Sequence, residues 1–208
     1  MRYKKAIIKT RIIINQLPSL STVIRDQMPW FPAWGIKFNM EIEDFREVLS
    51  TFNNLKPDEK WLLLAYDVAA SEKHLWTAWY SMKRNQLKGK MVANSPDAEF
   101  LRIIAGTHQV RIAFENAGIR NNDHSAWLIR LPDIEIEIEI DENEIKRDTY
   151  NNHEEEANNI IQRLNGTLIP KRPAPTIEGL NRISYNNTTS SEKSLEECFL
   201  LHLISSNL

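Results

Sequence analysis

The chain has 208 residues, a net charge of −2 and an apolar content of 42%. This length suits one well-buried domain and is short for two. No run approaches the roughly 18 apolar residues that cross a bilayer, and no signal peptide is recognisable. The single cysteine, Cys198, cannot form an internal disulfide. These features predict a cytoplasmic protein that makes no use of a membrane.

The charge is distributed unevenly along the chain. Residues 133–158 hold eleven carboxylates and two basic side chains, a net charge of −9, so the rest of the chain is net positive. When acid is segregated in this way, a near-neutral total does not exclude an anionic partner.

Four runs predict β-strands, at residues 6–14, 61–66, 125–131 and 134–140. In the last of these, isoleucines alternate with acidic residues, which predicts a strand with one apolar face and one acidic face near a sheet edge. Residues 28–38 contain two prolines and a glycine among aromatic residues and predict a loop.

Helical periodicity predicts helices at residues 42–55, 70–85, 95–106, 107–117, 153–165 and 194–204. Their expected capping residues are Asn39, Ser95, Thr107, Asn152 and Ser194. Residues 170–175 predict a connector, and 185–191 a polar stretch. Strands and helices without regular alternation indicate an α+β fold, a single domain with a mixed, largely antiparallel sheet packed against several helices.

No catalytic or metal-binding motif is present. The five histidines are scattered, and no P-loop, nucleophile elbow or dinucleotide fingerprint occurs. Asp97 and Glu99 could form an acid–base pair, but carboxylates in a first helical turn are explained more simply by the helix dipole. We therefore expect no enzymatic activity, no cofactor and no metal.

Basic side chains gather around the two expected helix starts at Ser95 and Thr107. A helix N-terminus offers unpaired N–H groups and partial positive charge, which suit a phosphate. The basic residues are Lys88, Lys90, Arg102, His108 and Arg111. Asn94 and Ser95 add short polar side chains, and His74 and Trp76 are either stacking surfaces or core residues. The competing interpretation is an ordinary solvated surface.

An ordered series of residues resembles a known family. It comprises Asp67-Val-Ala-Ala-Ser-Glu-Lys-His-Leu, Lys88-Gly-Lys-Met-Val-Ala-Asn-Ser, Glu99, Ala105-Gly106, Gln109-Val110, Ala113, Ala117-Gly118-Ile119 and Asp123-His-Ser-Ala-Trp-Leu-Ile. The series resembles the PRPK-binding protein family, the small kinase-binding subunits of the KEOPS complex. The resemblance is clear over residues 61–131 and weaker beyond them.

The resemblance implies a non-catalytic subunit that binds the small atypical kinase of that complex. It also implies binding of tRNA through its single-stranded CCA 3′ end, for threonylcarbamoyladenosine modification next to the anticodon, and no small-molecule substrate. By position, the candidate tRNA-binding residues are Lys73, Lys90, Asn94, Ser95, Arg102, His108 and Gln109. The apolar residues of the last helix, Leu195, Phe199 and Leu203, contact either the kinase or the core of the chain.

Relative to the family, residues 1–60 form an extended N-terminal region and residues 133–150 an acidic strand extension, within a single domain covering 1–208. Two alternatives remain open. One is a pure protein-interaction module without RNA contact. The other is a small metal-dependent nuclease that uses Glu99.

Overall fold

The computed structural model describes residues 29–134, 150–185 and 194–205. The strand expected at 6–14, most of the Ile–Glu alternation at 134–140 and the polar stretch at 186–191 lie outside these ranges. In chain order the elements are β1 (Ala33–Phe38), α3 (Phe45–Leu55), β2 (Trp61–Ala65), η1 (Tyr66–Val68), α4 (Glu72–Leu87), α5 (Pro96–Ile104), α6 (Val110–Ala117), β3 (Ser125–Arg130), η3 (Asn151–His153), α7 (Glu154–Arg163), β4 (Gly166–Ile169), α8 (Ile177–Arg182) and α9 (Leu195–Ser205).

The four strands of the described chain form one antiparallel sheet in the order β2-β3-β1-β4. Side chains alternate between its two faces, as the two-residue period of a strand requires. Leu62 and Leu64 of β2 face one core, and Trp61 and Leu63 face the other. Both faces are covered, so β2 has an unbroken apolar sequence, as expected for a strand buried on both sides.

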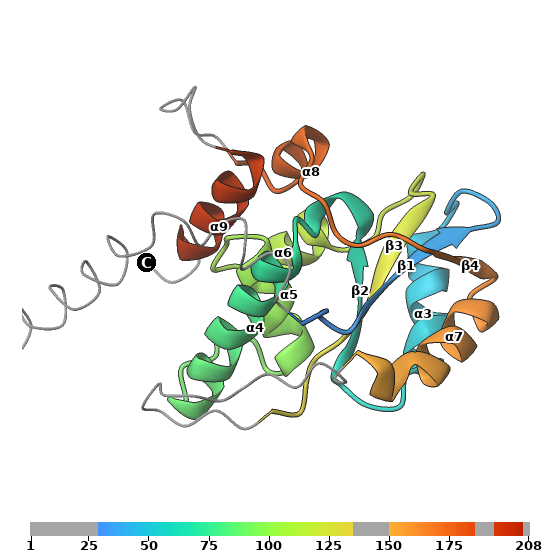
Figure 1. Ribbon diagram of the computed structural model, residues 1–208, viewed down its shortest axis with the longest axis horizontal. Coiled ribbons are helices and arrows are strands. Elements are labelled where there is room, and N and C mark those ends of the chain that lie inside the picture. The colour runs from blue at the N-terminus through green and yellow to red at the C-terminus, as the bar shows by residue number, and fades with distance from the viewer. Residues whose placement is uncertain (1–28, 135–149, 186–193, 206–208) are drawn as a thin grey trace, which may run out of the picture.

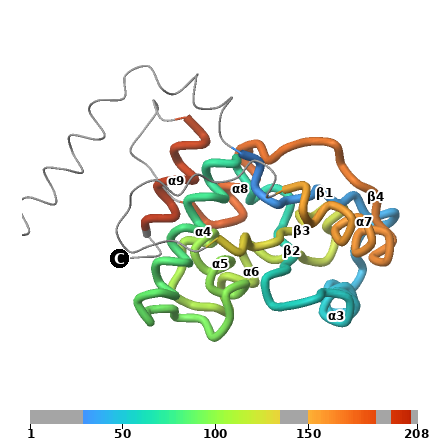
Figure 2. Tube along the Cα trace, turned by 60° about the horizontal axis from the view of Figure 1, so that its bottom comes forward, coloured from blue at the N-terminus to red at the C-terminus, as the bar shows by residue number. Residues whose placement is uncertain are grey.

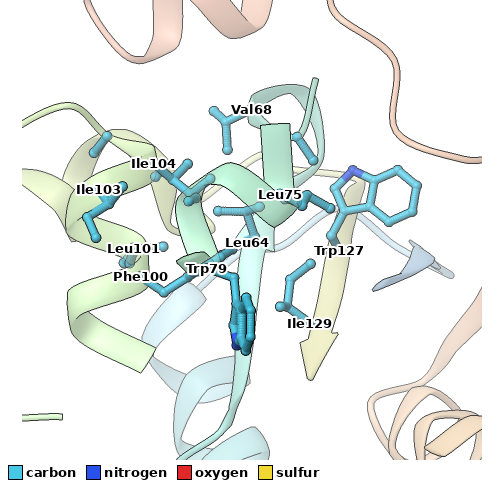
Figure 3. Packing of buried hydrophobic residues seen from close by; sticks show 14 of the residues in the cluster. Leu64, Val68, Leu75, Trp79, Phe100, Leu101, Ile103, Ile104, Trp127 and Ile129 are labelled. Atoms are coloured by element: carbon cyan, nitrogen blue, oxygen red, sulfur yellow. The ribbon is translucent and has the colours of Figure 1, made fainter. Parts of the chain in front are cut away.

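Helices cover the two faces unequally. On one face lie α4, α5 and α6, with α9 packed on α4 and α5, and α8 packed on η1 and α9; on the other face lie α3 and α7 (Figure 1). In Figure 2 the sheet lies between α9 and α3. Figure 3 shows the larger core, where Leu64 and Ile129 of the sheet gather with Trp79 of α4 and Ile104 of α5. This arrangement is the single α+β domain that the sequence predicts.

The prediction of a loop at residues 28–38 is wrong for its second half. Residues 33–38 form β1, which lies in the interior of the sheet between β3 and β4. The glycine that suggests a loop serves packing instead, because a Cβ at Gly35 would come within 2.9 Å of the Ile169 Cβ on β4. Pro32 precedes the strand, so no proline disturbs the ladder.

Several helix starts differ from the prediction. Asp44, not Asn39, caps α3 by accepting from the Arg46 N–H at 2.9 Å. The residue that caps α7 is His153, not Asn152, and its side chain makes no capping bond. The capping box of α9 is confirmed, since Ser194 and Glu197 exchange hydrogen bonds.

Two short elements were missed, β4 and α8. Both lie in the stretch between α7 and α9, where few residues repeat with a recognisable period. Thr176 caps α8 by accepting from the Gly179 N–H at 3.0 Å. Within the described ranges, no helix combines the length and apolarity needed to cross a membrane.

Candidate nucleic-acid interface

The loop between α4 and α5, residues 88–95, is exposed but firmly anchored. The Lys90 N–H donates to the Asn85 carbonyl at 2.8 Å, and Gly89 adopts a φ of +60° that lets the chain turn. The N–H groups of Val92 and Ala93 both donate to Glu99 Oε2 at 3.1 Å. The side chains of Lys88, Lys90 and Asn94 are therefore presented to solvent from a fixed backbone.

Beneath this loop lies a buried ion pair within α5. Glu99 is 0% exposed and Arg102 1% exposed. Arg102 donates from Nε to Glu99 Oε2 at 3.0 Å and from Nη2 to Oε1 at 2.7 Å, a bidentate arrangement. Burial alone would raise the pKa of the Glu99 carboxyl, but hydrogen bonds from Arg102, the Ala93 N–H and Asn85 outweigh it and hold that pKa below its usual value. Glu99 is therefore ionised and fully used as an acceptor.

The same ion pair also holds the loop before α6. Arg102 Nη1 donates to the Thr107 carbonyl at 2.8 Å, while Asn85 Nδ2 of α4 donates to Glu99 Oε1 at 2.9 Å. We call the four residues Asn85, Glu99, Arg102 and Thr107 the hub. The hub fixes loop 88–95 and loop 105–109 to one pair of side chains. The exposed His108 and Gln109 belong to the second of these loops.

The two helix starts are not equivalent as anion sites. At the start of α5, the Asp97 carboxylate accepts from the Ala98 N–H at 2.8 Å and pairs with Lys56 at 3.2 Å. A carboxylate of the chain thus already occupies the positive end of that helix. Ser95 Oγ also donates to Asp97.

At the start of α6 the surroundings are different. The helix begins at Val110, three residues later than the predicted start at Thr107, and Gln109 is its cap. The Thr107 hydroxyl accepts from the Gln109 N–H at 3.2 Å. Its first turn carries no acidic residue, and the exposed His108 and Arg111 flank it. Arg111 makes a loose pair with Glu115 at 3.5 Å, with both side chains largely in solvent. This end is the better of the two for a phosphate.

The predicted tRNA-binding residues fall into three groups. Lys90, Asn94, Ser95, His108 and Gln109 lie on the two loops that the hub joins. Lys73 is exposed but sits in the first turn of α4, a helix of 16 residues and so about 24 Å long, at the opposite end from Lys90. Arg102 is buried, so its guanidinium presents no surface to a phosphate and acts only through the backbone that it holds.

The possible stacking surfaces, His74 and Trp76, belong to the core, at 0% and 4% exposure. His74 Nδ1 lies 3.4 Å from the Ala70 N–H, and its ring meets Phe199 edge-on at 5.3 Å. Burial, together with the nearby His202, lowers the pKa of His74 to about 3. His74 therefore packs against α9, whereas Trp76 packs on Phe31 and donates from Nε1 to the Pro29 carbonyl at 2.8 Å, so neither forms a binding surface.

The apolar residues of α9 divide between two faces. Phe199 and Leu203, at 0% and 2% exposure, pack into the core of the chain. Leu195 is 36% exposed at the first turn, and Leu201 and Ile204 are 38% and 55% exposed on the side away from the core. The side of α9 that is open to a partner therefore carries Leu201 and Ile204, which the sequence did not single out.

A hollow of about 280 Å³ lies between α3, β2, α5 and α6. Its walls are mostly apolar, and the two charged side chains in its lining, Lys56 and Asp97, neutralise each other. Among the described residues, no group of three or more potential metal-ligating side chains comes together. Neither feature provides convergent acids and bases of the kind that hydrolysis needs.

Sequence reasoning missed the hub because it assigned Glu99 to the helix dipole. A usable signal was present: Glu99 and Arg102 have opposite charges at a spacing of three, which puts them on one face of a helix. The role of Asn85, 14 residues earlier, depends on how α4 packs on α5 and has no local signature.

Comparison with models of known protein families and with curated proteins finds no match to this chain.

Proposed function

We propose that this chain is a cytoplasmic, non-catalytic subunit of a tRNA-modifying assembly of the KEOPS type. It binds the 3′ end of tRNA through the loops before α5 and α6, and it binds a small atypical kinase through α9. The RNA would be modified elsewhere in the assembly, to threonylcarbamoyladenosine next to the anticodon.

One observation carries the RNA-binding part of the proposal. The hub fixes two solvent-exposed polar loops, which carry Lys88, Lys90, Asn94, His108 and Gln109, onto a single buried ion pair. An unpaired RNA end is bound by cations close to phosphates and by short polar groups close to base edges. Both kinds of side chain occur on these loops, and the resemblance over residues 61–131 supports the same assignment.

The direct test measures binding of the full chain to tRNA with and without its last three nucleotides, at several salt concentrations. We expect tighter binding of the intact tRNA and a logarithm of affinity that falls linearly with the logarithm of salt. Equal affinity for the two RNAs would remove the 3′-end assignment.

Two lysines offer a matched pair for locating the site. Both are exposed, but Lys90 lies on a hub-anchored loop and Lys73 at the far end of α4. Lys90→Gln should weaken tRNA binding and reduce the salt slope by about one phosphate contact, whereas Lys73→Gln should leave both nearly unchanged. The reverse result would move the RNA surface to the start of α4.

The outward face of α9 favours the kinase contact. It also supports a second candidate function, a protein-interaction module that does not bind RNA. Leu201 and Ile204 are exposed beside each other on the helix, one turn apart. Leu201→Asp should abolish co-purification of the kinase, and Leu168→Asp on β4, at a similar exposure of 41%, should not. Kinase binding with no detectable tRNA binding would establish the second function instead.

A further inference from the structure

We infer that the Glu99–Arg102 ion pair is the positioning element of the RNA site: it makes loops 88–95 and 105–109 one rigid surface and so produces selectivity for the RNA 3′ end. This inference rests on the RNA-binding function proposed above. Glu99 is 0% exposed and Arg102 1% exposed, so neither acts by direct contact with RNA.

The first step of the argument is the way in which the pair is connected. Glu99 accepts from the N–H groups of Val92 and Ala93 at 3.1 Å, and Arg102 donates to the Thr107 carbonyl at 2.8 Å. All three contacts are to backbone groups, so they fix the path of each loop whatever side chains it carries. The pair thus joins two segments that are otherwise separated by the whole of α5.

The second step is that the pair is more elaborate than α5 itself requires. A nine-residue helix needs neither a fully buried charge nor its counter-ion, and desolvating the two is costly. The cost is offset here because every acceptor position of Glu99 is used, by Arg102, Asn85 and the loop N–H groups. Such fully satisfied buried networks fix one geometry more strictly than apolar packing does.

The third step concerns what rigidity does for a single-stranded ligand. A tail of a few nucleotides offers few contacts, and each loop that must be ordered on binding reduces the affinity. Loops that are held in advance favour the ligand that reaches both at once, an RNA end that extends from Lys90 and Asn94 to His108 and Gln109. RNA without this end meets only one loop and gains little.

The test uses a charge-neutral pair of substitutions and a matched control. Glu99→Gln with Arg102→Met removes the ion pair without leaving one charge buried alone. The control, Asp123→Asn with Arg182→Met, removes another bidentate pair, with distances of 2.8 and 2.7 Å, which holds α8 to the turn before β3. For each protein, the ratio of tRNA affinities with and without the last three nucleotides is measured in the full chain.

The ratio is the decisive quantity because loss of folded protein lowers both affinities equally and leaves their ratio unchanged. We expect the ratio to fall to about one in the hub variant and to stay at the wild-type value in the control. A hub variant with the wild-type ratio overturns the inference but leaves the RNA-binding function intact. A wild-type ratio of one overturns both.

A second variant keeps the inference testable if the first does not fold. Asn85 is half-buried, and Asn85→Ala removes a single donor to Glu99. It should lower the affinity ratio and speed hydrogen exchange of the Val92 and Ala93 amides. Faster exchange with an unchanged ratio would show that rigidity of the loop does not determine selectivity, and would overturn the inference.

Discussion

Two arginines, one buried and one partly exposed, hold opposite ends of α6, and they do so by different routes. Arg102 reaches the Thr107 carbonyl before the helix, and Arg182 of α8 reaches the Gly118 carbonyl after it, each at 2.8 Å. The carboxylate partner of Arg102 lies three residues away in the same helix, whereas that of Arg182, Asp123, is 59 residues distant. An eight-residue helix is marginal on its own, so these arginines fix its position.

The comparison shows that similar geometry can serve different purposes. The Arg182 pair ties α8 to the loop between α6 and β3, and its side chains keep 11% and 16% exposure. The Arg102 pair is fully enclosed and lies under the loops with the exposed basic residues. We therefore assign a structural role to the first pair and a role in binding to the second.

The largest effect is expected from removing one partner of the enclosed pair. Glu99→Leu leaves the Arg102 guanidinium buried without its counter-ion and should lower the free energy of unfolding by about 3–5 kcal/mol. Asp123→Leu should lower it by less, about 1–3 kcal/mol, because Arg182 can still reach water and Asp67 at 3.6 Å. Urea unfolding monitored by tryptophan fluorescence measures both, and equal losses would contradict the distinction between the pairs.

The contrast between the two pairs also explains how far sequence reasoning reaches. Periodicity located α3, α4 and α6, because each repeats its apolar residues on one face, whereas the starts of α5 and α9 were marked by Pro96 and by the capping box at Ser194. It could not assign β1, where Gly35 serves close packing against Ile169 rather than a turn. It also could not find Arg182 or Asn85, whose partners are set by tertiary packing.

The candidate site shows the same limit at the level of single residues. Exposed Lys90 and Asn94 lie where the sequence places them, on the loop before a helix. His108 lies in a loop and not in the first turn that the sequence predicts, because α6 begins only at Val110. Arg102 is basic like Lys90 but has a different role. It lies three residues after Glu99 on the same helix face, and that face is buried. The apolar residues of α9 divide in the same way, since Phe199 and Leu203 face the core and Leu201 and Ile204 do not.

A pair of glycines tests how tightly the loop before α6 is enclosed. Gly106 and Gly89 have nearly the same left-handed backbone, with φ of +58° and +60°. A Cβ at Gly106 would lie 2.2 Å from His202 Nε2, whereas one at Gly89 would meet open space. Gly106→Ala should therefore cost about 1–3 kcal/mol more than Gly89→Ala in the free energy of unfolding. Equal costs would mean that His202 moves aside freely.

Acid should loosen the same region through His74. The pKa of this histidine is lowered to about 3 by burial, so the folded state excludes a proton that the unfolded state binds below about pH 6.5. Stability should therefore fall with decreasing pH, by up to about 1.4 kcal/mol per pH unit from this group, from about 6.5 down to 3.

His202, whose pKa is also lowered by burial, adds to the loss in the same direction. The contribution of Glu99 has the same sign, but it begins only near pH 4.5, where the unfolded carboxyl takes up its proton. The window between pH 6.5 and 5 therefore excludes Glu99 as a source of the loss. His74→Gln should flatten the dependence of urea unfolding on pH there, and an unchanged slope would exclude His74 as its source.

The smallest expected effect lies on the surface of α6 itself. Arg111 and Glu115 are 84% and 54% exposed and 3.5 Å apart, so Glu115→Gln should change the free energy of unfolding by no more than about 0.5 kcal/mol. The substitution removes a negative charge from the last turn of α6 and leaves Arg111, in the first turn, without its partner. Binding of tRNA should therefore stay the same or strengthen, most clearly at low salt, where exposed charges are least screened. Weaker binding of tRNA would indicate that the RNA lies away from α6. The Glu99–Arg102 pair would then have only a structural role, like the Asp123–Arg182 pair.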